Sequence, residues 1–165
     1  MRHLCLGLCG SGLGGKDIFR GAGMELVMDN SRLEKLIPKD KFDFEPFPML
    51  MEISEDDVKP ILHKLLFCIA DMSWPIATEM IRVLVRFSSS VVPHVKDVLM
   101  PTETDEEWKY FIISHLIPQL PTSSQELLLE SVKRIYDNPK SSEIRGEVWE
   151  IAKEYIEGCQ HNPRG

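Results

Sequence analysis

Apolar residues recur along most of this chain with the period of an α-helix. The clearest run has them three or four positions apart, at Val58, Ile61, Leu62, Leu65, Leu66 and Ile69. This spacing places them on one helix face, which is stable only when another element covers it. We find no convincing segment with the alternation of apolar and polar residues that a half-buried strand requires. The sequence therefore predicts an all-α protein of about six to eight helices.

Residue patterns at the helix ends predict where several helices start and stop. Ser54 precedes three acidic residues, so we expect it to cap a helix that Pro60 then interrupts. Ser73 is expected to cap the next helix, over residues 74–87. Polar residues of this helix fall on one narrow stripe, which predicts a central helix covered on two sides. Residues 88–90 are three serines, which predict a turn after it.

Further signals mark the helices of the second half of the chain. Pro93 is expected in the first turn of a short helix, where a missing N–H costs nothing. Gly158 is expected to end the last helix. In a capping box, a hydroxyl and a carboxylate each accept a hydrogen bond from a backbone N–H at a helix start. Such boxes are predicted for Thr104 with Glu107 and for Ser123 with Glu126.

Two stretches of the sequence resemble each other. Asp71 to Trp74 and Asp105 to Trp108 each open a helix that is followed by a turn and a second helix, and the two tryptophans are 34 residues apart. Helix pairs at such a period cannot bury their apolar faces alone, so neighbouring pairs stack and share one core. We therefore predict a short α-solenoid of stacked antiparallel helix pairs, of the HEAT type.

Composition divides the chain into three parts. Residues 1–23 hold seven of the ten glycines, and we interpret them as a disordered leader or an upstream extension. Residues 24–158 are the predicted helical repeat domain. Residues 159–165 are polar and are expected to form a disordered tail.

The glycine-rich leader contains a sequence that imitates a phosphate-binding loop. Gly10 to Lys16 matches G-x-x-x-x-G-K, in which backbone N–H groups approach phosphate and the lysine reaches its outer oxygens. Asp17, however, stands where a hydroxyl should hold Mg²⁺, and no alternation of strands and helices follows. The short stretch from Leu4 to Leu8 also makes a poor signal peptide. We therefore expect no nucleotide and no other cofactor.

Charge and cysteine usage limit the partners of the protein. The net charge is −7, which disfavours nucleic acid and favours a protein or peptide with a basic contact face. No apolar run approaches the roughly 20 residues of a membrane-spanning helix, so no membrane association is expected. The four cysteines form no C-x-x-C pair or disulfide framework, which favours a cytoplasmic location. The histidines have no ligand neighbours at metal-binding spacing, so no metal site is predicted.

Three parts of the chain resemble a small helical domain family of unknown function. They are Leu36 to Lys41, then Leu65-Leu66 with Asp71 to Ala77, and finally Trp108 to Tyr110 followed by Leu116-Ile117. That family is found mostly in bacterial proteins and is related to HEAT-like repeats. Its most specific features here are Asp-x-x-Trp-Pro-x-Ala and the later Trp-Lys-Tyr. The resemblance covers about Asp29 to Gly158. It implies the helical fold and no established activity. Pro46 and Pro48 fall where the family usually has an uninterrupted helix.

The repeat and its neighbourhood supply the candidate binding surface. Both tryptophans are interpreted as core anchors, with an aromatic groove for a peptide as the alternative. Lys109 and Tyr110 are expected to be solvated or to border that groove, and His115 to be a satisfied core residue. No catalytic residue is assigned. The candidate surface consists of Asp71, Trp74, Asp105, Trp108, Lys109, Tyr110 and His115.

Two classes of function remain at this point. The first is a non-catalytic helical-repeat binding module that engages a protein or peptide, in a neutralising or regulatory role. The alternative is an enzyme or a regulatory domain with a small-molecule pocket between helix pairs. In that case His115, Asp71, Asp105 and Lys109 should converge in one concave site. If they cap separate helices, the alternative loses support.

Overall fold

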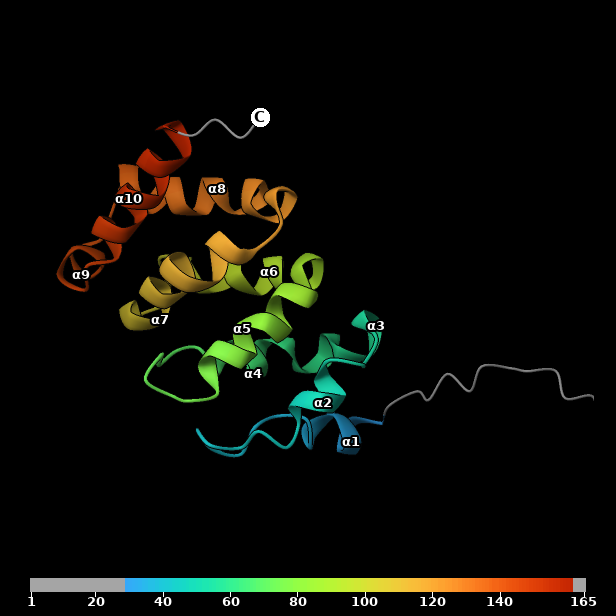
Figure 1. Cartoon of the computed structure of the whole chain (residues 1–165). Helices are drawn as coiled ribbons and strands as arrows, with labels where there is room; N and C mark the ends of the chain where they lie inside the picture. Colours follow the sequence, from blue (N-terminus) through green and yellow to red (C-terminus); the bar gives the residue numbers. More distant parts are fainter. Residues whose placement is uncertain (1–28, 162–165) are drawn as a thin grey trace, which may run out of the picture.

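The computed structural model describes residues 29–161, and these residues form helices joined by turns, with no β-strand among them (Figure 1). The predicted all-α class is confirmed. The predicted leader, residues 1–23, lies outside the described residues. The elements are α1 (Asn30–Glu34), α2 (Phe47–Leu50), α3 (Glu55–Val58), η1 (Lys59–Ile61), α4 (Leu62–Phe67), α5 (Ala77–Arg86), α6 (Ser88–Val98), α7 (Glu106–Phe111), η2 (Ile112–Leu116), η3 (Ile117–Gln119), α8 (Thr122–Asp137), α9 (Ser141–Arg145) and α10 (Val148–His161).

The segments are shorter and more numerous than predicted, because prolines interrupt the apolar pattern. Pro46 and Pro48 flank the start of α2, which is only four residues long. Ser54 caps α3 by accepting a hydrogen bond from the Asp57 N–H at 3.2 Å, as predicted. Pro60 turns the chain into the 3₁₀ segment η1 before α4 begins, so the predicted interruption is confirmed.

Helix α5 begins later than predicted. Ser73 does not cap it, because residues 71–76 form turns and Ile76 occupies the cap position; the Ser73 N–H donates to the Asp71 carboxylate at 2.8 Å within these turns. The helix starts at Ala77, whose N–H donates to the Trp74 carbonyl at 2.9 Å. It buries five residues and packs against α2, α4, α6 and η2, which is the environment predicted for a central helix.

The three serines after α5 are helical and do not form the predicted turn. The chain changes direction at Phe87 alone, and Ser88 is the first residue of α6. The Glu55 carboxylate of α3 caps this helix from a distance, because it accepts from the Ser90 N–H at 3.1 Å and from the Ser90 hydroxyl at 2.6 Å. Pro93 consequently lies inside α6 and not in its first turn.

The caps predicted for the second half are also corrected. Asp105, not Thr104, caps α7 by accepting from the Trp108 N–H at 3.0 Å. The first turn of α8 follows Pro121 directly and has no side-chain cap, so Ser123 does not serve as one. Gly158 lies within α10, which continues to His161 and so passes the predicted domain boundary at 158.

The remaining irregularities follow α7 and precede α10. After Phe111 the helix widens into the π-helical turn η2, where the Ser114 hydroxyl donates to the Tyr110 carbonyl at 2.7 Å. Between α9 and α10 the chain turns at Gly146 and Glu147, and Glu147 has φ 60°.

The helices pack so that the two halves of the chain lie at opposite ends of the molecule. In Figure 1, α1 and α2 are at one end, α9 and α10 are at the other, and α4, α5, α6 and α7 lie between them. One continuous set of buried apolar side chains runs from Leu33 in α1 to Ile156 in α10. In residues 29–161, no helix has the length and apolar character needed to cross a bilayer.

Candidate binding groove

The two repeat tryptophans lie in different environments. Trp108 is 4% exposed, its indole N–H donates to the Leu66 carbonyl at 3.2 Å, and the Phe67 ring meets it edge-on at 5.3 Å. It is therefore a core residue that joins α7 to α4. Trp74 is half-buried in the turn before α5 and packs at the edge of the same core. The similar stretches of sequence thus differ in local structure.

The two aspartates of the candidate surface each stabilise a separate turn. Asp71 accepts from the Ser73 N–H before α5, and Asp105 accepts from the Trp108 N–H at the start of α7. Hydrogen bonds from Ser73 lower the pKa of Asp71, so this carboxylate is held ionised. These structural hydrogen bonds account for the position of each aspartate without a catalytic role.

His115 lies in the π-helical turn and is half-buried. Its Nδ1 is 2.6 Å from the Ser114 hydroxyl oxygen, and its ring meets Phe111 edge-on at 5.7 Å. The imidazole therefore has a polar partner and an aromatic partner within its own turn. His115 is therefore satisfied, but it is half-buried and does not belong to the core, where it was predicted to lie.

The prediction that Lys109 is solvated is wrong. Lys109 is fully buried, and its ammonium lies 3.2 Å from Glu143 Oε1 and 3.3 Å from Glu106 Oε2. Glu143 is also fully buried and accepts from Arg134 at 2.6 and 2.7 Å and from the Lys140 N–H at 2.8 Å. We call Glu106, Lys109, Arg134 and Glu143 the buried ion cluster. Its members come from α7, α8 and α9.

The protonation of Glu143 follows from these contacts. Burial alone would raise the pKa of its carboxyl group, because a charge is costly away from water. The hydrogen bonds from Arg134, Lys140 and Lys109 outweigh burial and lower the pKa to about 2. Glu143 is therefore ionised at neutral pH and balances the buried ammonium of Lys109.

The buried ion cluster fixes the turn between α9 and α10. Arg134 also donates to the Leu99 carbonyl at 2.7 Å, which ties the end of α6 to the same point. Gly146 packs so closely on Glu106 that an added Cβ would lie 2.6 Å from the Glu106 Cβ. The chain then passes through the left-handed conformation of Glu147, which is strained for a residue with a side chain.

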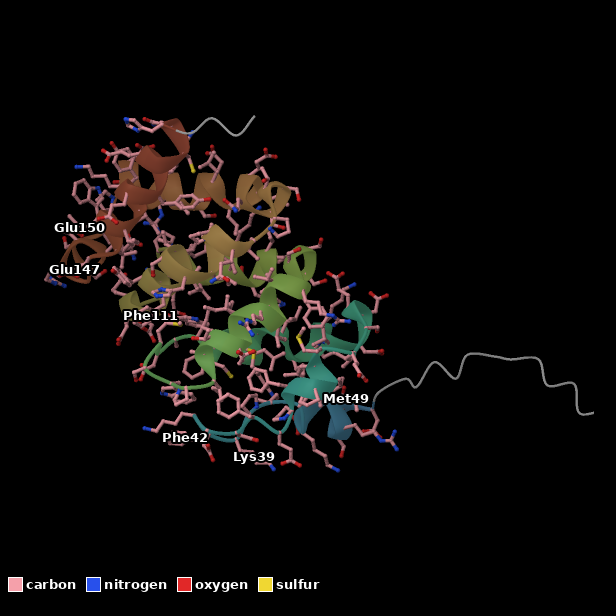
Figure 2. All side chains as sticks on the ribbon, in the orientation of Figure 1. Lys39, Phe42, Met49, Phe111, Glu147 and Glu150 are labelled. Atoms are coloured by element: carbon pink, nitrogen blue, oxygen red, sulfur yellow. The ribbon has the colours of Figure 1, made fainter. Side chains whose placement is uncertain are left out.

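This turn and α7 border two adjoining hollows on the surface. One, of about 200 Å³, lies against α10, and the other, of about 340 Å³, lies against α7; both include Tyr110 and Glu147. Figure 2 shows Phe111, Glu147 and Glu150 on the same side of the molecule. We call the combined feature the acidic groove, which is lined by Glu107, Tyr110, Phe111, Gly146, Glu147, Glu150, Ile151 and Glu154.

Charge and aromatic surface are combined in the acidic groove. Its four carboxylates belong to exposed residues, and within residues 29–161 none of them is in an ion pair. The Tyr110 and Phe111 rings meet edge-on at 5.7 Å and are both half-buried. The groove thus offers negative charge beside aromatic surface.

A separate hollow of about 230 Å³ lies between α8 and α10. Gln125, at its wall, donates to the Leu120 carbonyl at 2.6 Å and accepts from the Tyr155 hydroxyl at 3.0 Å. These polar groups therefore bond to the fold itself. Among the described residues, no three His, Cys, Asp or Glu side chains are grouped as metal ligands.

The sequence matches the model of the family described as Domain of unknown function (DUF5071) over residues 36–156, which is most of the chain. The chain belongs to this family. The DUF5071 region spans α2 to α10 and includes the buried ion cluster and the acidic groove. The sequence resemblance to a family of unknown function is thereby confirmed, whereas its HEAT-like character stays a prediction. Comparison with curated proteins gives no match.

Sequence reasoning included Tyr110 in the candidate surface but missed the acidic residues around it. Glu147, Glu150 and Glu154 are spaced by three and four positions, so one helix face would carry all of them. That spacing is a signal in the DUF5071 sequence that could have been found. The partnership of Lys109 with Glu143 has no such signal, because the two residues are 34 positions apart.

Proposed function

We propose that this protein is a non-catalytic binding module, built as a HEAT-type helical repeat, whose acidic groove holds a basic segment of a protein partner. The observation that carries the proposal is the set of four exposed carboxylates around Tyr110 and Phe111, none of them in an ion pair within residues 29–161. Arginine and lysine side chains pair with carboxylates and also rest on aromatic faces. A basic segment therefore satisfies both features of the groove.

The conformation of Glu147 supports this proposal. A residue with a side chain at φ 60° is less stable than glycine in the same place, by about 1–2 kcal/mol. Backbone strain of this kind is typical of functional sites, where the side chain is needed despite its cost. Here the Glu147 side chain borders both hollows of the groove.

The buried ion cluster supplies the rigidity that such a site needs. Glu143 is held by Lys109 and Arg134 only a few residues before Glu147, and Gly146 is packed against α7. A groove that is held in shape before binding loses less conformational entropy when the partner arrives. A neutralising role, in which the partner is a basic toxin or enzyme, is one form of this function. We place the module in the cytoplasm, because the spacing of its four cysteines in the sequence is not that of a disulfide framework.

Binding can be tested by reversing charge in the groove. The wild type and the double variant Glu147→Lys/Glu150→Lys are immobilised and exposed to native extract, and the captured proteins are identified by mass spectrometry. The control, Glu52→Lys/Asp97→Lys, makes the same charge change at exposed sites outside the groove. We expect a basic protein that is retained by the wild type and the control but lost with the groove variant.

The captured protein is then purified and titrated against all three forms. A loss of affinity of about tenfold or more in the groove variant alone is expected, since two charge contacts are reversed. Equal binding by all three forms would refute the groove as the binding site. Circular dichroism confirms that each variant is folded before it is used.

A further inference from the structure

The end of the molecule opposite the acidic groove carries another hollow, of about 460 Å³, between α1 and α2. Figure 2 shows Lys39, Phe42 and Met49 at this end, away from Glu147 and Glu150. We call this hollow the cationic groove. It is lined by Arg32, Lys35, Leu36, Lys39, Glu45, Pro46 and Met49.

The charge of the cationic groove is opposite to that of the whole chain. Three of the residues that line it, Arg32, Lys35 and Lys39, are cationic and one, Glu45, is acidic, although the chain has a net charge of −7. Within the described residues, none of the three cations is in an ion pair. The Lys39 N–H donates to the Asp43 carboxylate at 2.9 Å, which fixes the turn that carries this lysine.

Apolar surface accompanies these cations. Leu36 is almost buried in the wall of the groove, and Met49 is 49% exposed. The preceding loop exposes Phe42 and Phe44, at 64% and 46%. Half of the large apolar side chains that are exposed in the described residues lie between 42 and 51, so this end has an apolar surface that its own fold leaves uncovered.

We propose that the cationic groove is a second docking surface, which binds an acidic amphipathic helix of another protein. Such a helix presents apolar side chains to the groove on one face and carboxylates to Arg32, Lys35 and Lys39 at its margins. Two other occupants fit less well. A flat bilayer does not reach the walls of a hollow, and a second copy would offer its acidic groove, which is itself concave.

The inference does not depend on the proposed function, because the two grooves lie at opposite ends of the molecule. A protein with both would bring a basic and an acidic partner together. The variant Glu147→Lys/Glu150→Lys should therefore bind the acidic probe described below as well as the wild type does.

The probe is a fluorescently labelled helical peptide of about 16 residues, with leucines at i, i+3, i+4 and i+7 and glutamates along both margins of that leucine face. Its binding to the full chain is followed by fluorescence anisotropy. The variant Lys35→Glu/Lys39→Glu should bind about tenfold more weakly, because two charge contacts become repulsive. The control Lys96→Glu/Lys133→Glu changes charge equally on α6 and α8, and it should bind within about twofold of the wild type.

A second variant and a second peptide test the apolar part. Met49→Ser should weaken binding several-fold without changing its dependence on salt. A peptide of the same composition with its leucines scattered around the helix should not bind.

Three results would overturn the proposal. The first is equal binding of the amphipathic peptide and the peptide with scattered leucines, or equal binding of the probe by Lys35→Glu/Lys39→Glu and Lys96→Glu/Lys133→Glu. The second is binding to phosphatidylserine vesicles without binding to the peptide, which would assign the groove to lipid. The third is a concentration-dependent mass increase in sedimentation that Lys35→Glu/Lys39→Glu abolishes, which would assign the groove to a second copy of this chain.

Discussion

At the scale of single residues, the most consequential arrangement is the pairing of Lys109 with Glu143. Both side chains are fully buried, so each charge relies on the other and on Arg134 in place of water. A buried pair is costly to break, because the remaining charge has no partner. In the sequence Lys109 stands between two aromatic residues and gives no sign of this role, so its burial could not be predicted.

Glu143→Gln should destabilise the protein by about 3–5 kcal/mol at neutral pH, because Lys109 and Arg134 lose their shared carboxylate. The pKa of Glu143 is lowered in the folded state from 4.5 to about 2. The ionised Glu143 carboxylate therefore stabilises the folded state above pH 4.5, and this stabilisation is lost as the pH falls from 4.5 towards 2. Urea denaturation at several pH values should show the wild type and the variant converging at the acidic end. The control is Glu130→Gln on an exposed residue, which should change stability little at any pH.

The tryptophans allow a second test at this scale. Trp108→Ala should cost about 3–5 kcal/mol, since it empties a buried site and removes the hydrogen bond to Leu66. Trp74→Ala should cost about 1–2 kcal/mol, because half-burial leaves less area to lose. Urea denaturation of both variants measures the difference. Equal losses would contradict the inequivalent environments described above.

At the scale of elements, periodicity predicted the apolar faces well, while caps predicted the boundaries poorly. The run from Val58 to Ile69 is buried as expected, because the need to cover an apolar face is a property of the local sequence. The start of α6 could not be read from Ser88, because its cap is Glu55 of another helix. Tertiary contacts of this kind override local signals, and a single sequence does not contain them.

The turn between α9 and α10 depends on one glycine, and α10 contains another that serves as a control. Gly146→Ala should destabilise the protein by about 1–3 kcal/mol, because its Cβ would collide with Glu106. Gly158→Ala should stabilise it by about 0.5–1 kcal/mol, because a Cβ there meets nothing within 4 Å and alanine favours a helix. Thermal denaturation compares the two. Stabilisation by both changes would contradict the close packing at Gly146.

At the scale of the whole molecule, the all-α class was predictable from the sequence, but the position of the acidic and cationic grooves was not. The candidate residues were chosen around the two tryptophans, and Tyr110 is the one that borders the acidic groove. Acidic spacing in residues 147–154 could have identified the rest of that groove. That residues 147–154 lie beside α7 depends on packing between segments far apart in the chain.

The acidic groove also predicts how association with a basic partner responds to salt. Exposed charges more than about 8–10 Å apart are screened at physiological ionic strength, so the association rate should fall steeply as salt is added. Stopped-flow measurements with the captured partner test this. The groove variant Glu147→Lys/Glu150→Lys should show a much shallower dependence. An association rate that salt leaves unchanged would instead indicate binding through apolar contacts.

The cap that Glu55 provides to α6 has a consequence for following this molecule in solution. The Ser90 N–H donates both to the Phe87 carbonyl of its own turn, at 3.0 Å, and to Glu55, 35 positions earlier, so detachment of α3 removes one of its two acceptors and should speed its hydrogen exchange. In a spectrum of the labelled protein, that single amide would serve as a reporter for detachment of the α1–α3 end. If a ligand in the cationic groove tightens this end, the Ser90 signal should exchange more slowly, although no ligand atom touches it.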